Sequence, residues 1–429
     1  MDKKKKNIFV VGLDDFNLEK LRKLHEAREC EFLPAAKFDE IRGVESFDIP
    51  KLLDVADERI EKAGGIDAIV SYFDFPGTIL VPIIAKKYNL PGPSIESVLK
   101  CEHKYWSRHE QKKVIPDNIP RFKPFDPFDD NAYKKITFNP PFWIKPVKSY
   151  HSYLAYKIRD ADQFNEAMEE VRENIDYMEK PFFHIIDKYS DPDEFSGMKE
   201  KMYAETPIGG HQCTLEGYVF DDEIVVYGII DSITEEGKSS FARYEYPSSL
   251  PQEVQFRMAD IARKVIGQVG LKASAFNIEF FYDSEANEIY LLEINPRISQ
   301  SHGDIFEKVH GLSNHHIMLN LALNQRPEPL ENEGEFAVAA HFMLRSYHPG
   351  LARNVPGKEK IDALKKKYPE MVIQISVEEG TDLDDLPDYH IDSYSYVLAN
   401  INLGGEDRED LLDKYNDVVR ELAIKVEKK

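Results

Sequence analysis

Residues 277–281 read NIEFF, and residues 290–297 read YLLEINPR. These two apolar runs predict the antiparallel strands of a hairpin, with a polar turn between them. On such a hairpin Glu279 and Glu293 can point to the same face, and Asn295, two residues after Glu293, points that way as well. Two carboxylates and an amide oxygen are hard ligands suited to Mg²⁺ held together with nucleotide phosphates.

Arg297 follows this hairpin two residues after Asn295. Its guanidinium offers a planar fork for a phosphate or an acyl phosphate. The alternative is that both glutamates face solvent at strand ends and that Arg297 pairs with one of them. The complete set of side chains at this spacing favours the site for metal and phosphate.

The composition is that of a globular protein and excludes several classes of function. The chain has 429 residues, of which 42% are hydrophobic and 31% charged, and its length suggests two to four domains. A net charge of −22 repels a phosphate backbone, which argues against nucleic-acid binding. No apolar run approaches the roughly 18 residues of a membrane helix. Because the apolar stretch after the Lys-rich start is too short for a signal peptide, we expect a cytoplasmic protein.

Strand and helix patterns alternate over residues 1–93. This alternation predicts a parallel sheet with helices on both faces. No Gly-x-Gly-x-x-Gly follows the first strand, which argues against a dinucleotide site there. The turn residues at 90–94 mark the first domain boundary. We expect strands at 8–11, 31–35 and 68–70, and helices around 18–24, 52–62 and 79–88.

The pattern becomes antiparallel after residue 180. Between residues 94 and 180 we expect a helix that carries Lys104 and strands at 142–145 and 153–158. A further helix, capped by Asp160, is expected to run to about residue 177. Beyond residue 180, we expect strands at 214–220, 224–230, 275–282, 289–294, 336–344, 372–377 and 394–401, with helices at 253–269 and from 407.

The Glu279 and Glu293-x-Asn295-x-Arg297 elements, downstream of a Pro-Gly-Pro-Ser turn, resemble the ATP-grasp superfamily. The resemblance is closest to its biotin-carboxylase-like and L-amino-acid-ligase-like branch. It implies an α/β and α+β fold with a Rossmann-like pre-ATP-grasp domain, a small lid subdomain and an antiparallel nucleotide-binding domain. The implied domains are 1–93 (pre-ATP-grasp), 94–200 (first ATP-grasp part with the lid), 201–330 (second ATP-grasp part with the Mg-ATP site) and 331–429 (C-terminal α+β domain).

The resemblance also implies ATP and Mg²⁺ as cofactors, with Mn²⁺ as an alternative. Lys104 and Lys145 match two lysines that reach the nucleotide phosphates. Glu205 matches the glutamate of the adenine-binding hinge at 202–210, and Gln212 falls where relatives place a polar group on the ribose. The implied metal ligands are Glu279, Glu293 and Asn295, and the implied catalytic residue is Arg297. For the lysines, a solvated surface position remains open.

This chain departs from the family in two places. The lid loop 148–152 contains no glycine, and hydroxyl donors such as Ser149 or Ser152 would have to contact phosphate there. Ser301 stands where biotin carboxylases typically have a glutamate, and no Met-Lys-Met biotinylation site is present, which disfavours bicarbonate chemistry. The residues expected to line the substrate pocket are Glu216, Ser299, Gln300, Ser301 and His302. For Glu216 and Gln212, an outward-facing strand position remains open.

The hypothesis that follows is an ATP-dependent ligase. It would activate a substrate carboxylate as an acyl phosphate for attack by an amine of the amino-acid or peptide type. The alternatives are a bicarbonate-activating enzyme and a nucleotide-binding module without turnover. The expected partners are small-molecule carboxylate and amine substrates, without nucleic acid or membrane, and a homodimer is compatible with the sequence.

Overall fold

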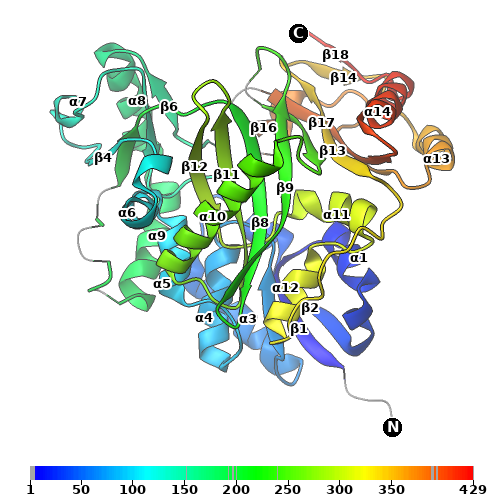
Figure 1. Cartoon of the computed structure of the whole chain (residues 1–429), viewed down its shortest axis with the longest axis horizontal. Coiled ribbons are helices and arrows are strands. Elements are labelled where there is room, and N and C mark those ends of the chain that lie inside the picture. Colours follow the sequence, from blue (N-terminus) through cyan, green and yellow to red (C-terminus); the bar gives the residue numbers. More distant parts are fainter. Residues whose placement is uncertain are drawn as a thin grey trace. The chain divides into compact units, whose positions relative to one another are not determined.

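The computed structural model divides into two compact units, and each is described by itself. The first unit comprises Met1–Tyr227, Leu250–Ile298 and Ile317–Pro327, and the second comprises Gly228–Ser249, Ser299–His316 and Glu328–Lys429. The structure describes residues 5–150, 152–191, 193–195, 198–199, 201–238, 240–387, 391–392 and 395–428. Figure 1 shows the labelled elements along the chain. The expected boundaries of four domains stay a prediction.

The N-terminal part of the first unit is a three-stranded parallel sheet in the order β2-β1-β3. The expectation of a parallel α/β sheet is therefore confirmed. Ile8 to Val11 of the central strand are almost completely buried, as their unbroken apolar run predicts. The elements are β1 (Lys6–Leu13), α1 (Asp15–Lys23), β2 (Cys30–Lys37), α2 (Phe38–Ile41), α3 (Ile49–Lys62), β3 (Ala68–Ser71) and α4 (Gly77–Tyr88).

A second, antiparallel sheet of the first unit has the order β4-β7-β5-β6. Asp160 caps the helix after β6 as expected, because its carboxylate accepts from the backbone N–H of Gln163. The elements here are α5 (Ile95–Glu102), α6 (Lys104–Val114), β4 (Phe122–Phe125), α7 (Ala132–Lys135), β5 (Phe142–Pro146), β6 (Tyr156–Ile158), α8 (Ala161–Asn174), α9 (Asp176–Tyr189) and β7 (Met202–Glu205).

The expected end of the capped helix near residue 177 is wrong. Helix α8 ends at Asn174, and a second helix, α9, begins at Asp176 and runs to Tyr189. Met178, Phe182 and Ile185 recur at helical spacing in α9 and are buried, so packing of an apolar face sustains it. The β5–α8 region also has its own buried cluster, which includes Phe142, Ile144, Phe164 and Val171. The segment assigned to the lid is therefore packed around a core of its own.

A third set of strands in the first unit includes the hairpin that carries Glu279 and Glu293. Strands β8 (His211–Phe220), β11 (Ser274–Asp283) and β12 (Glu288–Asn295) lie in the order β12-β11-β8, and all are antiparallel. Helix α10 (Gln252–Val269) precedes β11 in the chain. The turn after β8 has positive φ at Asp221 (49°) and Asp222 (63°), the backbone that a two-residue hairpin turn requires. It leads into β9 (Glu223–Thr234), the hydrogen-bonded neighbour of β8, so the strands expected at 214–220 and 224–230 are confirmed.

The second unit is built on an antiparallel sheet in the order β9-β10-β13-β17-β15. Its core includes Phe342, Ile401, Leu411 and Val418. The closing helix expected from residue 407 begins at Arg408, and Asp407 caps it. Strand β10 was not predicted, and residue 394 of the expected strand 394–401 lies outside the described residues. Its elements are β10 (Phe241–Tyr246), α11 (Gly303–His310), β13 (Val338–Ser346), β14 (Leu351–Arg353), α13 (Lys358–Lys367), β15 (Val372–Ile375), β16 (Ile391–Asp392), β17 (Ser395–Gly405), α14 (Arg408–Leu422) and β18 (Lys425–Glu427).

Short helical pieces complete the chain. Helix α12 spans His315–Ala322, and the 3₁₀ helices are His25–Glu29, Pro116–Asn118, Gln300–His302 and Leu383–Asp385.

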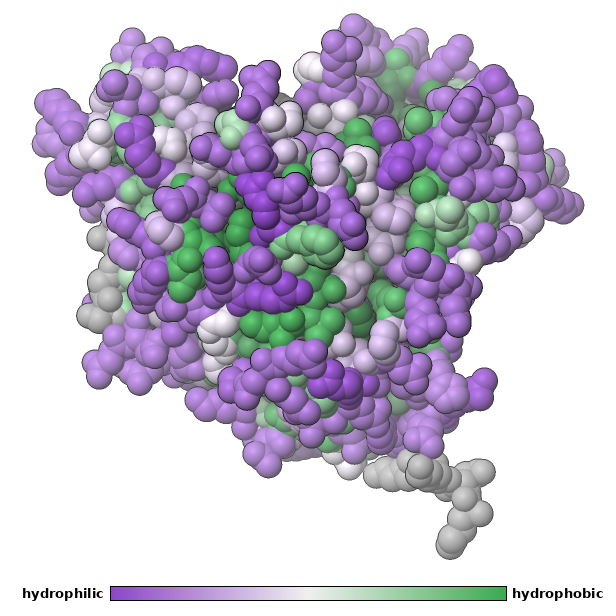
Figure 2. Space-filling model, in the orientation of Figure 1, coloured by the Kyte–Doolittle hydropathy of each residue, from purple (hydrophilic) through white to green (hydrophobic). Residues whose placement is uncertain are grey.

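Polar and charged side chains cover most of the surface in view in Figure 2, with apolar areas scattered among them. Phe128 and Phe256 are the large apolar side chains most exposed among the described residues, at 53% and 63%. In the same part of the chain, none of the helices combines the length and the apolar character needed to cross a lipid bilayer.

Candidate functional site

The β11–β12 hairpin places its polar side chains in two opposed pairs. Glu279 lies directly opposite Glu293, and Asn277 lies directly opposite Asn295. Opposed residues of antiparallel strands project to the same side, and residues two apart on one strand share a face. Glu279, Glu293 and Asn295 therefore share one face, as the sequence predicted.

Asn277 joins this face and was not predicted. Its side chain donates to the backbone carbonyl of Arg297 (3.1 Å), and it accepts from the amide nitrogen of Asn295 (3.0 Å). The Asn295 side chain is thereby oriented, with its Oδ1 directed away from Asn277. The position of Asn277 two residues before Glu279 was the signal in the sequence that could have identified it.

The two opposed glutamates differ in their partners. Burial, and then the neighbouring carboxylate of Glu293, raises the pKa of Glu279 to about 7, although Gln212 donates to its Oε2 (3.0 Å). Burial would also raise the pKa of Glu293, but its ion pair with Lys104 holds it below the usual range. Two carboxylates this close in a half-buried position create a strong demand for a cation.

Lys104, the first residue of α6, is therefore at the hairpin rather than at a solvated position. His103 caps this helix by accepting from the backbone N–H of Trp106 (3.1 Å), which fixes the start of α6. The Lys104 side chain is only 18% exposed and forms an ion pair with Glu293. The interpretation of Lys104 as an ordinary surface lysine is wrong.

Lys145 is likewise tied to a buried carboxylate. It lies on β5 opposite Tyr203 of β7, and its ammonium is 2.6 Å from Glu205 Oε1. Glu205 is 2% exposed, and Arg108 of α6 donates to its other oxygen, Oε2, at 3.0 and 3.1 Å. Burial alone would raise the pKa of Glu205, but Lys145 and Arg108 lower it to about 2. The Glu205 carboxylate therefore orients Lys145.

Arg108 is a second residue of this site, after Asn277, that was not predicted from the sequence. Besides Glu205, its guanidinium donates to the backbone carbonyls of Leu291 (3.0 Å) and Leu292 (2.8 Å) on β12, and to Gln111 (2.6 Å). One buried side chain thus links α6, the hinge strand β7 and the hairpin. Its position one helical turn after Lys104 was the available signal.

Arg297 pairs with a residue of the segment that follows β3. Its Nε donates to Asp74 Oδ1 (2.7 Å), Nη2 forms an ion pair with the same oxygen, and Nη1 donates to the carbonyl of Ile298 (3.1 Å). Asp74 follows β3 at the carboxyl end of the parallel sheet, where open α/β sheets bind ligands. Burial would raise the pKa of Asp74, but Arg297, Arg42 and Lys148 hold it well below its usual range. The alternative that Arg297 pairs with one of the glutamates is wrong.

The loop after β5 contains the serines considered for phosphate contacts. Lys148 is buried and forms an ion pair with Glu102 of α5, and burial lowers the pKa of this lysine to about 8. Ser149 is buried, and Ser152 is exposed in a turn with φ of 58°. Residue 151 of this loop lies outside the described residues.

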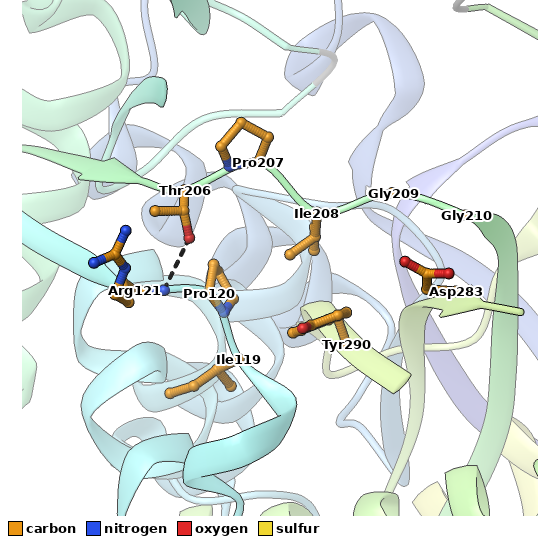
Figure 3. Close-up of a pocket in the computed structure, with 10 residues that line it drawn as sticks. All are labelled: Ile119, Pro120, Arg121, Thr206, Pro207, Ile208, Gly209, Gly210, Asp283 and Tyr290. Carbon is orange, nitrogen blue, oxygen red and sulfur yellow. Dashed lines mark hydrogen bonds between the residues drawn. The ribbon is translucent and has the colours of Figure 1, made fainter. Parts of the chain in front are cut away.

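A pocket of about 570 Å³ opens at the segment predicted to bind adenine (Figure 3). It is formed by the loop 119–121, the hinge residues 206–210 and two residues of the hairpin strands, Asp283 and Tyr290. The backbone N–H of Arg121 donates to the Thr206 hydroxyl (3.1 Å), which holds the loop against the hinge. Residues 206–210 of the hinge therefore line a hollow in the first unit.

The residues expected at the substrate pocket have different surroundings. Glu216 lies on β8 opposite Asn277, is fully buried, and accepts from the Tyr227 hydroxyl, so the outward-facing alternative is wrong for it. Gln212 is half-buried beside Glu279. Ser299, Gln300, Ser301 and His302 belong to the second unit, where Gln300–His302 is a 3₁₀ helix. His302 is buried there, with its ring centroid 5.2 Å from that of Tyr244.

Comparison with known proteins agrees with this geometry. Residues 138–303 match the family model of the ATP-grasp domain. The fold is similar to that of an L-amino acid ligase from Bacillus licheniformis, with 17% identity, full coverage of both chains and a TM-score of 0.75. It is also similar to a biotin carboxylase complex from Campylobacter jejuni, with 15% identity, 99% coverage of this chain, 92% of the other and a TM-score of 0.67. The expected ATP-grasp architecture is confirmed.

A curated relative matches in sequence over a shorter stretch. Urea amidolyase of Saccharomyces cerevisiae is 26% identical over 186 residues, which is 41% of this chain and 9% of the relative. The chain therefore spans only a small fraction of that relative's length.

Proposed function

Because the chain contains an ATP-grasp domain, we propose that it is an ATP-dependent ligase that joins a carboxylate to an amine. A carboxylate oxygen of the substrate attacks the γ-phosphorus of ATP, the bond to the β-phosphate oxygen breaks, and ADP leaves. The amine then attacks the carbonyl carbon of the acyl phosphate and loses a proton, and phosphate departs with the former carboxylate oxygen.

The protein's contribution is positioning and neutralisation of charge. The Lys104 and Lys145 ammonium groups, now paired with Glu293 and Glu205, would turn to the phosphate oxygens when these carboxylates gain other partners. Arg297, oriented by Asp74, would stabilise the negative charge of the acyl phosphate. No side chain needs to form a covalent bond with the substrate.

Mg²⁺ fits the hairpin on the chemistry of its donors. The described residues contain no group of three or more His, Cys, Asp or Glu side chains that could hold a metal by themselves. Mg²⁺ usually binds through one or two carboxylates and completes its shell with phosphates and water, and Glu279, Glu293 and Asn295 offer such a partial set. The ion would draw charge from the phosphate oxygens, and Mn²⁺ would serve in the same way.

The observation that carries the proposal is the convergence of this set on one hairpin. Opposed Glu279 and Glu293, with Lys104 paired to the second of them, form a site for a cation and phosphates rather than a surface salt bridge. A module that only binds nucleotide would not need the additional arginine, Arg297.

The direct test is ADP release with a panel of amino acids, dipeptides, polyamines and bicarbonate. We expect release that requires a carboxylate and an amine together. Release that is equal with ATP alone would contradict the proposal.

Bicarbonate activation is the second candidate because the fold is similar to that of a biotin carboxylase. The serine at position 301 argues against it, since a hydroxyl cannot act as a base as a carboxylate does. A homodimer and a cytoplasmic location complete the proposal and rest on the sequence alone.

A further inference from the structure

Arg42 is a cation at the carboxyl end of the parallel sheet that no part of the proposed mechanism uses. It follows α2 directly, in the connection after β2. Its guanidinium carbon lies 5.2 Å from the ring centroid of Phe73 and 5.0 Å from that of Tyr150. Aromatic faces hold a guanidinium by its plane and leave its N–H edge for a planar anion.

The Phe73 ring that supports Arg42 is itself fixed in place. It packs over Gly12, where a Cβ atom would come within 2.4 Å of the Phe73 ring. Gly12 also has a positive φ of 85°, which a larger residue rarely adopts. The sheet therefore builds a rigid aromatic support beneath Arg42.

Arg42 has no carboxylate partner within ion-pair distance among the residues that the structure describes. The nearby acid is Asp74, whose Oδ1 is engaged by Arg297. The charge of Arg42 nevertheless acts on Asp74, as does that of Lys148, which is paired with Glu102. Arg42, Arg297 and Lys148 thus all act on the single carboxylate of Asp74, and of the three Arg42 is the one without an ion pair among the described residues.

We infer that Arg42, together with Arg297, binds the carboxylate of the acid substrate. This inference rests on the proposed ligase function and locates its acid substrate at the carboxyl end of the β2-β1-β3 sheet. That end is the usual place for ligands of α/β sheets. The ligand class is a small organic carboxylate, because a planar fork on an aromatic support matches the two oxygens of that group. Asp74 keeps Arg297 in position and so is a positioning residue.

The test measures acyl phosphate formation by trapping it with hydroxylamine. Hydroxylamine nitrogen attacks the acyl carbon and phosphate leaves, so each turnover gives one hydroxamate and one phosphate. The probes are the twenty standard L-amino acids and a set of simple monocarboxylic acids, each with ATP and Mg²⁺, and the carboxylate that gives most hydroxamate is then titrated.

Three variants separate binding from structure. Arg42→Met keeps an aliphatic side chain against the two aromatic rings and removes the positive charge. Arg42→Lys keeps the positive charge and removes the planar guanidinium with its paired N–H donors. Arg22→Met is the matched control, since Arg22 is an exposed arginine in the last turn of α1. We expect Arg42→Met to raise the KM for the carboxylate about tenfold to hundredfold, with the KM for ATP nearly unchanged. Arg42→Lys should recover part of the loss, and the control should match the wild type.

Each outcome decides between the claims. If the wild-type protein forms hydroxamate and Arg42→Met forms it with the same KM for the carboxylate, the inference is wrong and the ligase function stands. If Arg42→Met raises both KM values equally and lowers the unfolding temperature, Arg42 has a structural role and the inference is also wrong. If the wild type forms no hydroxamate and releases no ADP with any probe, the proposed function fails and this inference fails with it.

Discussion

The buried Arg108–Glu205–Lys145 network should be essential for the stability of the first unit. Arg108 Nη2 and Glu205 Oε2 are 3.0 Å apart, and the two side chains are 3% and 2% exposed. Removing one partner of a buried pair costs about 3–5 kcal/mol, because the other charge is left without compensation. Lys145 stays at 2.6 Å from Glu205, so we expect Arg108→Met to cost about 3 kcal/mol, at the lower end of that range.

Urea unfolding followed by tryptophan fluorescence measures this cost. Both tryptophans lie close to the network, with Trp106 buried on α6 and Trp143 on β5 opposite Glu205. Arg263→Met is the control, because Arg263 is 50% exposed and forms its ion pair with the exposed Asp260. It should change the free energy of unfolding by less than about 0.5 kcal/mol.

The double variant Arg108→Met with Glu205→Gln gives the decisive comparison. Its loss should be clearly smaller than the sum of the two single losses, since the double variant leaves neither the Glu205 carboxylate nor the Arg108 guanidinium buried without its partner. A loss below about 1 kcal/mol for Arg108→Met, or strictly additive losses, would refute this account of the network.

Four further predictions concern catalysis, titration and dynamics. Glu293→Gln should abolish ATP turnover with little change in unfolding temperature, and wild-type turnover would remove Glu293 from the metal set. Bicarbonate with biotin should not raise ADP release above background, and detection of carboxybiotin would favour the second candidate. Burial raises the pKa of Glu179 from 4.5 to about 8, so the stability that its protonated form contributes is present below pH 4.5 and lost as pH rises towards 8. Glu179→Gln should therefore be more stable than the wild type at pH 8 and nearly equal at pH 4.5, and urea unfolding at both values checks this. An ATP analogue with Mg²⁺ should increase hydrogen-exchange protection within residues 135–180, and no change while nucleotide is bound would contradict the assignment of the lid.

The hairpin could be predicted because its signals are local. Alternating apolar residues set the two strands, and the polar turn between them lies in the same stretch of sequence. The turn alone would place Leu292 opposite Glu279, and a register shift between Glu279 and Phe280, which the alternation does not indicate, brings Glu293 there instead. The Asp160 cap was likewise local, because its carboxylate accepts from a backbone N–H three residues ahead.

Residues whose role depends on distant segments could not be predicted. Asp74 lies 223 residues before Arg297, and nothing in the sequence around either one indicates the pair. Arg108 needs the folded positions of β7 and β12 before its guanidinium has partners. Helix α9, in contrast, was not predicted although Met178, Phe182 and Ile185 recur in it at helical spacing. The roles assigned to individual residues in binding ATP and metal stay predictions.

The measurement closest to the central claim follows the substrate oxygen. The protein is incubated with ATP, Mg²⁺, an amine and a carboxylate substrate whose two oxygens are ¹⁸O, and the released phosphate is analysed by mass spectrometry. Activation as an acyl phosphate predicts one ¹⁸O atom in each phosphate, because the former carboxylate oxygen leaves with the phosphoryl group. Phosphate without ¹⁸O, released at the same rate, would show that water attacks ATP and would contradict the ligase function.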